Sequence, residues 1–228
     1  MLLDKKSIKK ITSATMLASK KNDSILFSIS YKSAYSISNL INNNSFSNKI
    51  KIYFSLKNIN LEILGIGSTI IVSEPLSAYE KISSITKKYI DNSIHIDNDT
   101  PAQPKFLMGF SFADQAQNSQ WKDYNPGKII LPEIQSEIID GICYNTISII
   151  IYPDTKYNQI AEKINHLYEI SESPSLSDVT NNRNASLNIG SEGTTYKEYT
   201  DQVNNIVSKI KKDDIDKGVI SRYEHYLL

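Results

Sequence analysis

Cysteine and long apolar stretches are nearly absent from this chain of 228 residues. Cys143 is the single cysteine, so no internal disulfide can form, and a reducing compartment is expected, the cytoplasm or the stroma of a plastid. No apolar run of the sequence is long enough to span a bilayer. Basic and acidic residues number 25 each, so net charge favours neither nucleic acid nor an anionic membrane as a partner.

Several motifs of common enzyme classes are also missing from the sequence. Its histidines, His95, His166 and His225, lie far apart and in no zinc-binding spacing, so a surface or loop position is the better interpretation of each. Gly65-Ile66-Gly67 lacks the third glycine and the following helix of a phosphate-binding loop, so a glycine pair at a strand bend is the better interpretation. No Gly-x-Ser-x-Gly sequence supports serine-hydrolase chemistry.

Apolar periodicity predicts five helices and seven strands. Helices are expected over residues 5–20, 33–42, 74–91, 155–168 and 196–211. Strands are expected over residues 24–32, 49–54, 61–67, 106–113, 127–135 and 141–152, and from Lys217 onward. The first strand should be half-buried, residues 57–60 should form a hairpin turn, residues 69–72 could continue the third strand, and residues 92–105 should be loop.

The N-terminal residues 5–21 are rich in Lys, Ser and Thr, as transit peptides are. Asp4 and the absence of arginine from this stretch favour an ordinary first helix.

Many consecutive strands with occasional helices predict an α+β fold with large antiparallel sheets and helices packed outside. The regular alternation of a doubly wound parallel sheet is missing. Three regions are expected: an α+β scaffold over residues 1–168, a flexible Ser/Asn-rich linker over 169–195, and the start of a further region over 196–228.

One stretch, Phe106-Leu107-Met108-Gly109-Phe110-Ser111-Phe112, combines aromatic residues with a glycine that lets another backbone approach closely. Trp121 follows, and then Leu131-Pro132-Glu133. Alone, the stretch predicts a strand. As a set, these residues resemble the N-terminal region of chorismate-utilising enzymes, which have a Gly-Phe-(Ala/Ser)-Phe strand, then a tryptophan, then a strand opening with Leu-Pro. Met108 stands where that family often has a second glycine.

The closing segment resembles the same family. Its members have an aromatic residue, a valine four positions on, a helix, and a strand of the type Lys-Val-Val-Leu-(Ala/Ser)-Arg. Here Tyr199 replaces the usual tryptophan, Val203 follows, and Gly218 replaces a valine in Lys217-Gly218-Val219-Ile220-Ser221-Arg222. The resemblance spans roughly residues 50 to 224.

The resemblance implies an incomplete version of the family's α/β sandwich, with chorismate as the substrate. It assigns Lys217 the role of catalytic base. Lysine at this position is typical of isochorismate and salicylate synthases, which use water, whereas the ammonia-using anthranilate and aminodeoxychorismate synthases usually have glutamine. The expected activity is therefore that of an isochorismate synthase, with salicylate or anthranilate synthesis as alternatives. Menaquinone or phylloquinone biosynthesis is the common destination of such a product.

The family also uses magnesium to hold the substrate carboxylate and a carboxylic acid to protonate the departing hydroxyl. The resemblance places those glutamates outside this sequence. One expectation is therefore an N-terminal portion of an isochorismate synthase, inactive alone and completed by a C-terminal polypeptide. The other is a non-catalytic binding or assembly module that retains the scaffold.

Overall fold

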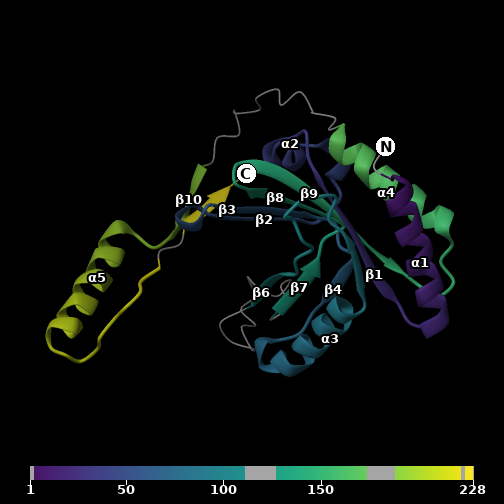
Figure 1. Cartoon of the computed structure of the whole chain (residues 1–228). Coiled ribbons are helices and arrows are strands. Elements are labelled where there is room, and N and C mark those ends of the chain that lie inside the picture. The colour runs from purple at the N-terminus through teal and green to yellow at the C-terminus, as the bar shows by residue number, and fades with distance from the viewer. Residues whose placement is uncertain (1–2, 111–126, 174–187, 222–223, 228) are drawn as a thin grey trace. The chain divides into compact units, whose positions relative to one another are not determined.

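The computed structural model describes residues 3–110, 127–173, 188–221 and 224–227 of the chain. The chain divides into two compact units, residues 1–177 and residues 178–228. A six-stranded sheet, a three-stranded sheet and four helices form the larger unit (Figure 1).

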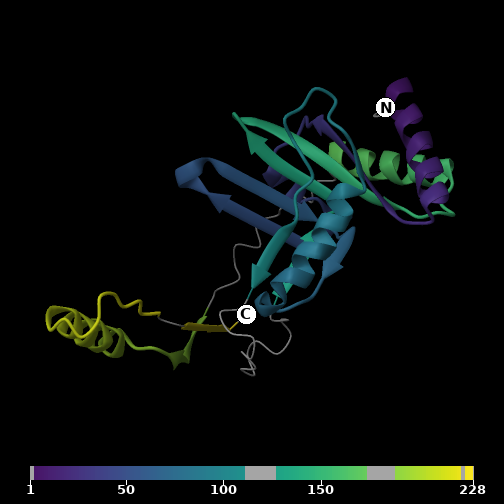
Figure 2. The same ribbon diagram turned by 60° about the horizontal axis from the view of Figure 1, so that its bottom comes forward.

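The six-stranded sheet is antiparallel between all neighbours except one pair. Its order is β2 (Lys51–Leu56), β3 (Leu61–Ile66), β8 (Ile134–Ile139), β9 (Ile142–Ile151), β1 (Ile25–Lys32) and β5 (Ser93–Ile96). Only β1 and β5 run parallel. The β2–β3 hairpin, turned by η2 (Lys57–Ile59), forms one edge of this sheet (Figure 2). The predicted hairpin and the α+β class are confirmed.

Helices α1 (Lys5–Lys21) and α4 (Tyr157–Glu172) cover one face of the six-stranded sheet (Figure 1). Asp4 caps α1 by accepting a hydrogen bond from the Ser7 backbone N–H at 2.7 Å. The apolar positions of α1 and α4 pack with every second residue of the central strands, and Phe27 and Ile29 of β1 are fully buried among them. The short helix α2 (Ile37–Ile41) and the turn η1 (Asn44–Phe46) complete this core.

A second, smaller core lies on the opposite face of the sheet. There the three-stranded sheet, in the order β4 (Ile70–Val72), β7 (Gly127–Leu131) and β6 (Leu107–Phe110), packs with α3 (Tyr79–Asp91). The turn η3 (Leu76–Ala78) precedes α3. Leu26 of β1 joins this second core, so β1 has buried side chains on both faces. The prediction of a half-buried first strand was wrong, because each face is covered by a separate layer.

Three further strand predictions are corrected by the sheet topology. Residues 127–135 are two strands in two different sheets, since Pro132 and Glu133 carry the chain from β7 to β8. Residues 69–72 do not continue β3 but form β4 in the smaller sheet. The expected loop over residues 92–105 contains β5, which pairs with β1. Of the expected strand over 106–113, residues 107–110 are β6 and residues 111–113 lie outside the described residues.

The smaller unit contains β10 (Asn188–Gly193), α5 (Tyr196–Lys211) and β11 (Glu224–Leu227). β10 and β11 pair antiparallel. The expected helix over 196–211 is confirmed with the same bounds. The strand expected from Lys217 is wrong for residues 217–221, which are irregular, and β11 begins at Glu224.

The expected linker over residues 169–195 has both its ends in regular structure. Residues 169–172 belong to α4 and residues 188–193 to β10. Residues 174–187, its middle, lie outside the described residues. None of the helices within the described ranges combines the length and apolar character needed to cross a bilayer.

Candidate functional site

Polar side chains line the face of the six-stranded sheet that is turned away from α1 and α4. They alternate with the apolar core positions along each strand. Because paired residues of neighbouring strands share a face, Ser30, Thr146 and Gln135 form one row, and His95, Ser28 and Ser148 form another. Of these six side chains, all except that of His95 are at most 2% exposed. This polar face is the most distinctive feature of the larger unit.

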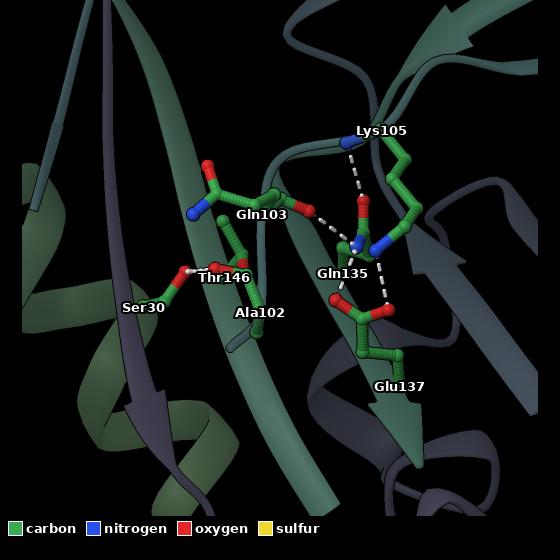
Figure 3. Close-up of polar contacts among 7 residues, drawn as sticks. All are labelled: Ser30, Ala102, Gln103, Lys105, Gln135, Glu137 and Thr146. Atoms are coloured by element: carbon green, nitrogen blue, oxygen red, sulfur yellow. Dashed lines mark hydrogen bonds and ion pairs between the residues drawn. The ribbon is translucent and has the colours of Figure 1, made fainter. Parts of the chain in front are cut away.

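A segment that we call the crossing segment, residues 97–105, passes over this polar face from β5 toward β6. The Ser30 hydroxyl donates to the Ala102 carbonyl at 3.1 Å and shares a hydrogen bond of 2.7 Å with the Thr146 hydroxyl (Figure 3). Serine and threonine hydroxyls can donate and accept hydrogen bonds at once. The Ser30 hydroxyl can therefore bond to Thr146 within the sheet and to the Ala102 carbonyl of the crossing segment.

Gln135 binds the crossing segment as a neighbouring peptide group would. Its side-chain oxygen accepts from the Lys105 backbone N–H at 2.8 Å, and its side-chain nitrogen donates to the Gln103 carbonyl at 3.0 Å. The same nitrogen also lies 3.2 Å from an oxygen of Glu137, whose other oxygen pairs with the Lys105 ammonium (Figure 3). The Glu137 side chain is only 4% exposed, so these partners replace contacts that water would otherwise make with it. We call Gln135, Glu137 and Lys105 the clamp.

His95 lies at the β5 end of the polar face, beside Ser28. Both ring nitrogens are buried and have no hydrogen-bond partner among the described residues. Burial lowers the pKa of His95 and favours the neutral imidazole. The interpretation of a surface or loop histidine is wrong for His95, which lies in β5 with both ring nitrogens buried.

The glycine pair of β3 has a structural explanation. A Cβ on Gly65 would lie 2.7 Å from both the Leu107 side chain and the Pro132 ring. Gly67 has a φ of +67°, in the left-handed region, and a Cβ there would collide with Glu133. The glycines thus leave room for Leu107 at the start of β6 and for Pro132 and Glu133 after β7. Gly67 forms a bend at the end of β3, so the prediction of a strand bend is confirmed.

Glu133, the last residue of the Leu-Pro-Glu motif, is part of an ion-pair network. One carboxylate oxygen pairs with the Lys49 ammonium, and the other lies 3.2 Å from the Lys163 ammonium. Burial alone would raise the pKa of Glu133, but the two lysines outweigh burial and lower it. The motif therefore joins the residues just before β2 to α4.

The other motif residues divide between described and undescribed parts of the chain. Phe106 and Phe110 pack against the second core, and Leu107 lies over Gly65. Ser111, Phe112 and Trp121 lie outside the described residues. The structure thus brings the Phe106–Phe110 part of the first motif next to Pro132.

Lys217, the predicted catalytic base, lies in the smaller unit, where its side chain is exposed in an irregular segment. A Cβ on the next residue, Gly218, would lie 2.5 Å from the Ile206 side chain of α5. Glycine at this position therefore lets the segment rest on α5. The catalytic role of Lys217 stays a prediction.

A magnesium site has no visible basis in the described residues. Among them, no three His, Cys, Asp or Glu side chains gather closely enough to hold a metal ion. The expected magnesium therefore stays a prediction about residues other than these.

Sequence reasoning missed the clamp. Alternating polar residues at Gln135 and Glu137 within an apolar strand were a visible signal that something polar covers them. Their partner Lys105 is about 30 positions away along the chain, a relation that no local pattern contains.

Comparison with known proteins identifies the family. The family model described as chorismate binding enzyme matches residues 9–227. No curated protein matches the sequence. Among solved structures, the chain is similar to MenF, the menaquinone-specific isochorismate synthase from Escherichia coli, with 10% sequence identity and a TM-score of 0.45. The match covers 96% of this chain and 47% of that one, so the chain spans just under half the length of that structure.

Proposed function

This chain belongs to the family of chorismate binding enzymes, and from that membership we propose that it forms part of an isochorismate synthase. The observation that carries the proposal is Lys217, at the start of the Lys-Gly-Val-Ile-Ser-Arg segment. In the family, lysine at that point accompanies water as the nucleophile.

In the proposed reaction, water adds at one ring carbon of chorismate and a hydroxyl leaves from another. The Lys217 amine takes a proton from the attacking water, and a carboxylic acid gives a proton to the departing hydroxyl, which leaves as water. A lysine acts as a base only where burial or nearby positive charge favours its neutral amine. Because Lys217 is exposed in the described structure, the proposal includes further protein that encloses it.

We assign that further protein to a complementing polypeptide, which would also supply the acid and the metal ligands. Magnesium bound by those ligands would hold a substrate carboxylate. Two observations support such a partner. The described residues contain no group of metal-binding side chains. The edge strand β2 also exposes apolar side chains, with Tyr53 50% exposed and Phe54 49% exposed.

A non-catalytic binding module is the second candidate function. It is favoured by the same exposure of Lys217, since an exposed lysine at a chain bend is ordinary in a protein without catalysis. Salicylate or anthranilate synthesis would use the same scaffold with a different product.

The experiment is to purify the tagged chain from its source cells with whatever polypeptides remain bound, and to supply chorismate and magnesium. The preparation should form isochorismate. Lys217→Ala should lower kcat at least about 100-fold, as expected for loss of a positioned base. The matched control Lys212→Ala, an exposed lysine just after α5, should leave kcat unchanged. Full turnover by Lys217→Ala would rule out this lysine as the base, and a preparation that binds chorismate without converting it would favour the binding module.

A further inference from the structure

β2 is an edge strand of the six-stranded sheet, and within the described part of the chain its strand partner is β3 alone (Figure 2). An edge strand keeps unpaired N–H and C=O groups along its outer side, and proteins usually protect such an edge with proline, a bulge or charged side chains. β2 contains no proline, and its register with β3 has no bulge. Its single charged residue, Lys51, donates to the Ile41 carbonyl at 2.6 Å. β2 is therefore an unprotected edge.

Large apolar side chains of β2, and of the residue before it, are also exposed. They lie on both faces of the strand, because successive side chains of a strand alternate between its faces. Contiguous exposed apolar surface of this kind marks an interaction site. The four side chains that are between 39% and 50% exposed are those of Ile50, Tyr53, Phe54 and Leu56.

The pairing with β3 shows which backbone groups of β2 face outward. Ile50 accepts a hydrogen bond from the Gly67 N–H at 2.8 Å, so positions of even number along β2 bond to β3. Residues of an antiparallel strand pair alternate between positions that exchange hydrogen bonds and positions that do not. Lys51, Tyr53 and Ser55 therefore turn their N–H and C=O groups away from β3, toward the open side of the sheet.

We propose that β2 pairs with β2 of a second copy of this chain, antiparallel and with Tyr53 on the two-fold axis. In this register the two Tyr53 residues face each other, and Lys51 of each copy faces Ser55 of the other. These are the outward-facing positions, so their backbone groups form the new hydrogen bonds. The two six-stranded sheets become one continuous sheet.

The same register matches the apolar side chains of the other face. Phe54 of one copy lies opposite Ile52 of the other, and Leu56 lies opposite Ile50. Cross-strand apolar pairs of this kind stabilise an antiparallel pair. A register centred on Ser55 would instead set Ile50 and Ile52 opposite the η2 turn and its end, where no apolar partner meets them. The sequence of β2 is thus complementary to itself about Tyr53.

The charges of the sheet agree with this register and with a second copy as the occupant. Ser55 lies opposite Glu62 of β3, so one row of side chains would run from Lys51 of the second copy through Ser55 to Glu62. Opposite charges would then share a face two strands apart, at about 10 Å. A register centred on Lys51 would place two lysines directly opposite each other, which destabilises a strand pair.

The inference goes beyond the proposed function, because neither chorismate nor a catalytic residue takes part in the dimer. A complementing polypeptide is the competing occupant of this edge, but it would not require the sequence of β2 to match itself. A pair of six-residue strands buries less than the roughly 1,200 Å² of a stable complex. The dimer should therefore be weak and reversible, with a dissociation constant on the order of 10 µM.

Analytical ultracentrifugation of the purified full chain, over a concentration range around that constant, measures the dimer. Phe54→Lys should weaken dimerisation at least about tenfold, because it sets an ammonium against Ile52 of the second copy. Met16→Lys, at an exposed apolar residue of α1, is the matched control and should dimerise as the unaltered chain does. Lys51→Glu and Glu62→Lys should each weaken the dimer about threefold, and the double variant should restore it.

Disulfide cross-linking tests the register in a Cys143→Ala background. Tyr53→Cys should form a disulfide-linked dimer on mild oxidation, because the Cα atoms of bonded residues directly opposite each other are about 5.5 Å apart, within disulfide range. Ser55→Cys, on the same edge, should not cross-link to its counterpart. That counterpart would lie four positions further along the strand, about 14 Å away.

A chain that stays monomeric at all concentrations would overturn the proposal, and so would a dimer that Phe54→Lys leaves unchanged. Ser55→Cys cross-linking as readily as Tyr53→Cys would overturn the register. A chain that is monomeric alone but binds another polypeptide through β2 would assign the edge to that polypeptide instead of to a second copy. Failure of the proposed function looks different: the dimer would still depend on β2, but no isochorismate would form in the turnover assay.

Discussion

Glu137 has a polar side chain that lies almost entirely inside the larger unit, where the side chain is 4% exposed. Its oxygens are satisfied by Gln135 and Lys105, which tie the sheet to the crossing segment. A buried carboxylate without partners is strongly destabilising, so these contacts are needed for the native arrangement. The Lys105 ammonium needs the ion pair with Glu137 less than Glu137 does, because the Lys105 side chain is 39% exposed and can be hydrated.

Glu137→Ala should lower the free energy of unfolding by about 2 kcal/mol, since it leaves a small cavity and removes a charged hydrogen-bond partner of Lys105. Glu137→Gln should cost less, because the amide keeps the shape and one acceptor oxygen. Urea unfolding of the full chain measures both. Glu162→Ala, at an exposed position of α4, is the control and should change little. A Glu137→Ala variant as stable as the unaltered chain would show that the clamp does not stabilise the fold.

His95 predicts a pH dependence of stability. Its pKa in the folded chain is lowered by burial from the usual value of 6.5, while Lys10 and Asp97 act on it in opposite directions. The unfolded chain therefore binds the proton more readily, so stability is fully present above pH 6.5 and is lost as the pH falls through the lowered folded value.

The expected loss of stability between about pH 7.5 and about pH 5.5 should be smaller in His95→Gln than in the unaltered chain, because that variant has no titrating imidazole. Denaturant unfolding at the two pH values measures the difference. His166→Gln, at an exposed position of α4, should keep the original pH dependence. Identical pH dependence in the chain and in His95→Gln would show that another group is responsible.

At the scale of elements, local sequence signals predicted what local interactions decide. The start of α5 follows from Thr195, whose hydroxyl accepts from the Glu198 N–H at 3.2 Å, while the Glu198 carboxylate accepts from the Thr195 N–H at 2.9 Å. The same reciprocal cap lies directly before the first apolar positions of α5. The β2–β3 hairpin was predicted for the same reason, because its turn lies between two adjacent strands.

Elements that depend on distant partners were not predicted. β5 is only four residues long and exists through its pairing with β1, more than sixty positions earlier. Only Pro132 and Glu133 lie between β7 and β8 in the sequence, and the sheet topology assigns the two strands to different sheets. In the sequence, the alternating serines of β1 indicate a face exposed to solvent. The crossing segment, residues 97–105, covers this face at Ser30, and no local pattern in β1 contains that contact.

Thr195→Ala should destabilise the first turn of α5 by about 1 kcal/mol, because the cap loses its side-chain acceptor. Hydrogen exchange of the α5 amides, followed by mass spectrometry, should show protection lowered about fivefold. Thr200→Ala, inside the same helix, should leave protection unchanged or raise it, since alanine is the better helix former. Unchanged protection in Thr195→Ala would mean that the cap does not determine where α5 begins.

At the scale of the molecule, the sequence predicted the α+β class and the family from residue types in a set order. It could not predict the environment of Lys217. The strand expected there depends on neighbours for residues 217–221, and the described structure contains none that pair with them. The catalytic proposal therefore depends on what surrounds Lys217, whereas the polar face and the clamp are properties of the larger unit alone.

The proposed isochorismate synthesis is tested most directly by the source of the atom that is added to chorismate. The tagged chain, purified with its bound polypeptides, is incubated with chorismate, magnesium and ammonium in ¹⁸O-labelled water, and the product is identified by chromatography and mass spectrometry. We expect isochorismate carrying one ¹⁸O atom, with formation lost in Lys217→Ala and kept in Lys212→Ala. A nitrogen-containing product, or isochorismate formed equally well by Lys217→Ala, would contradict it.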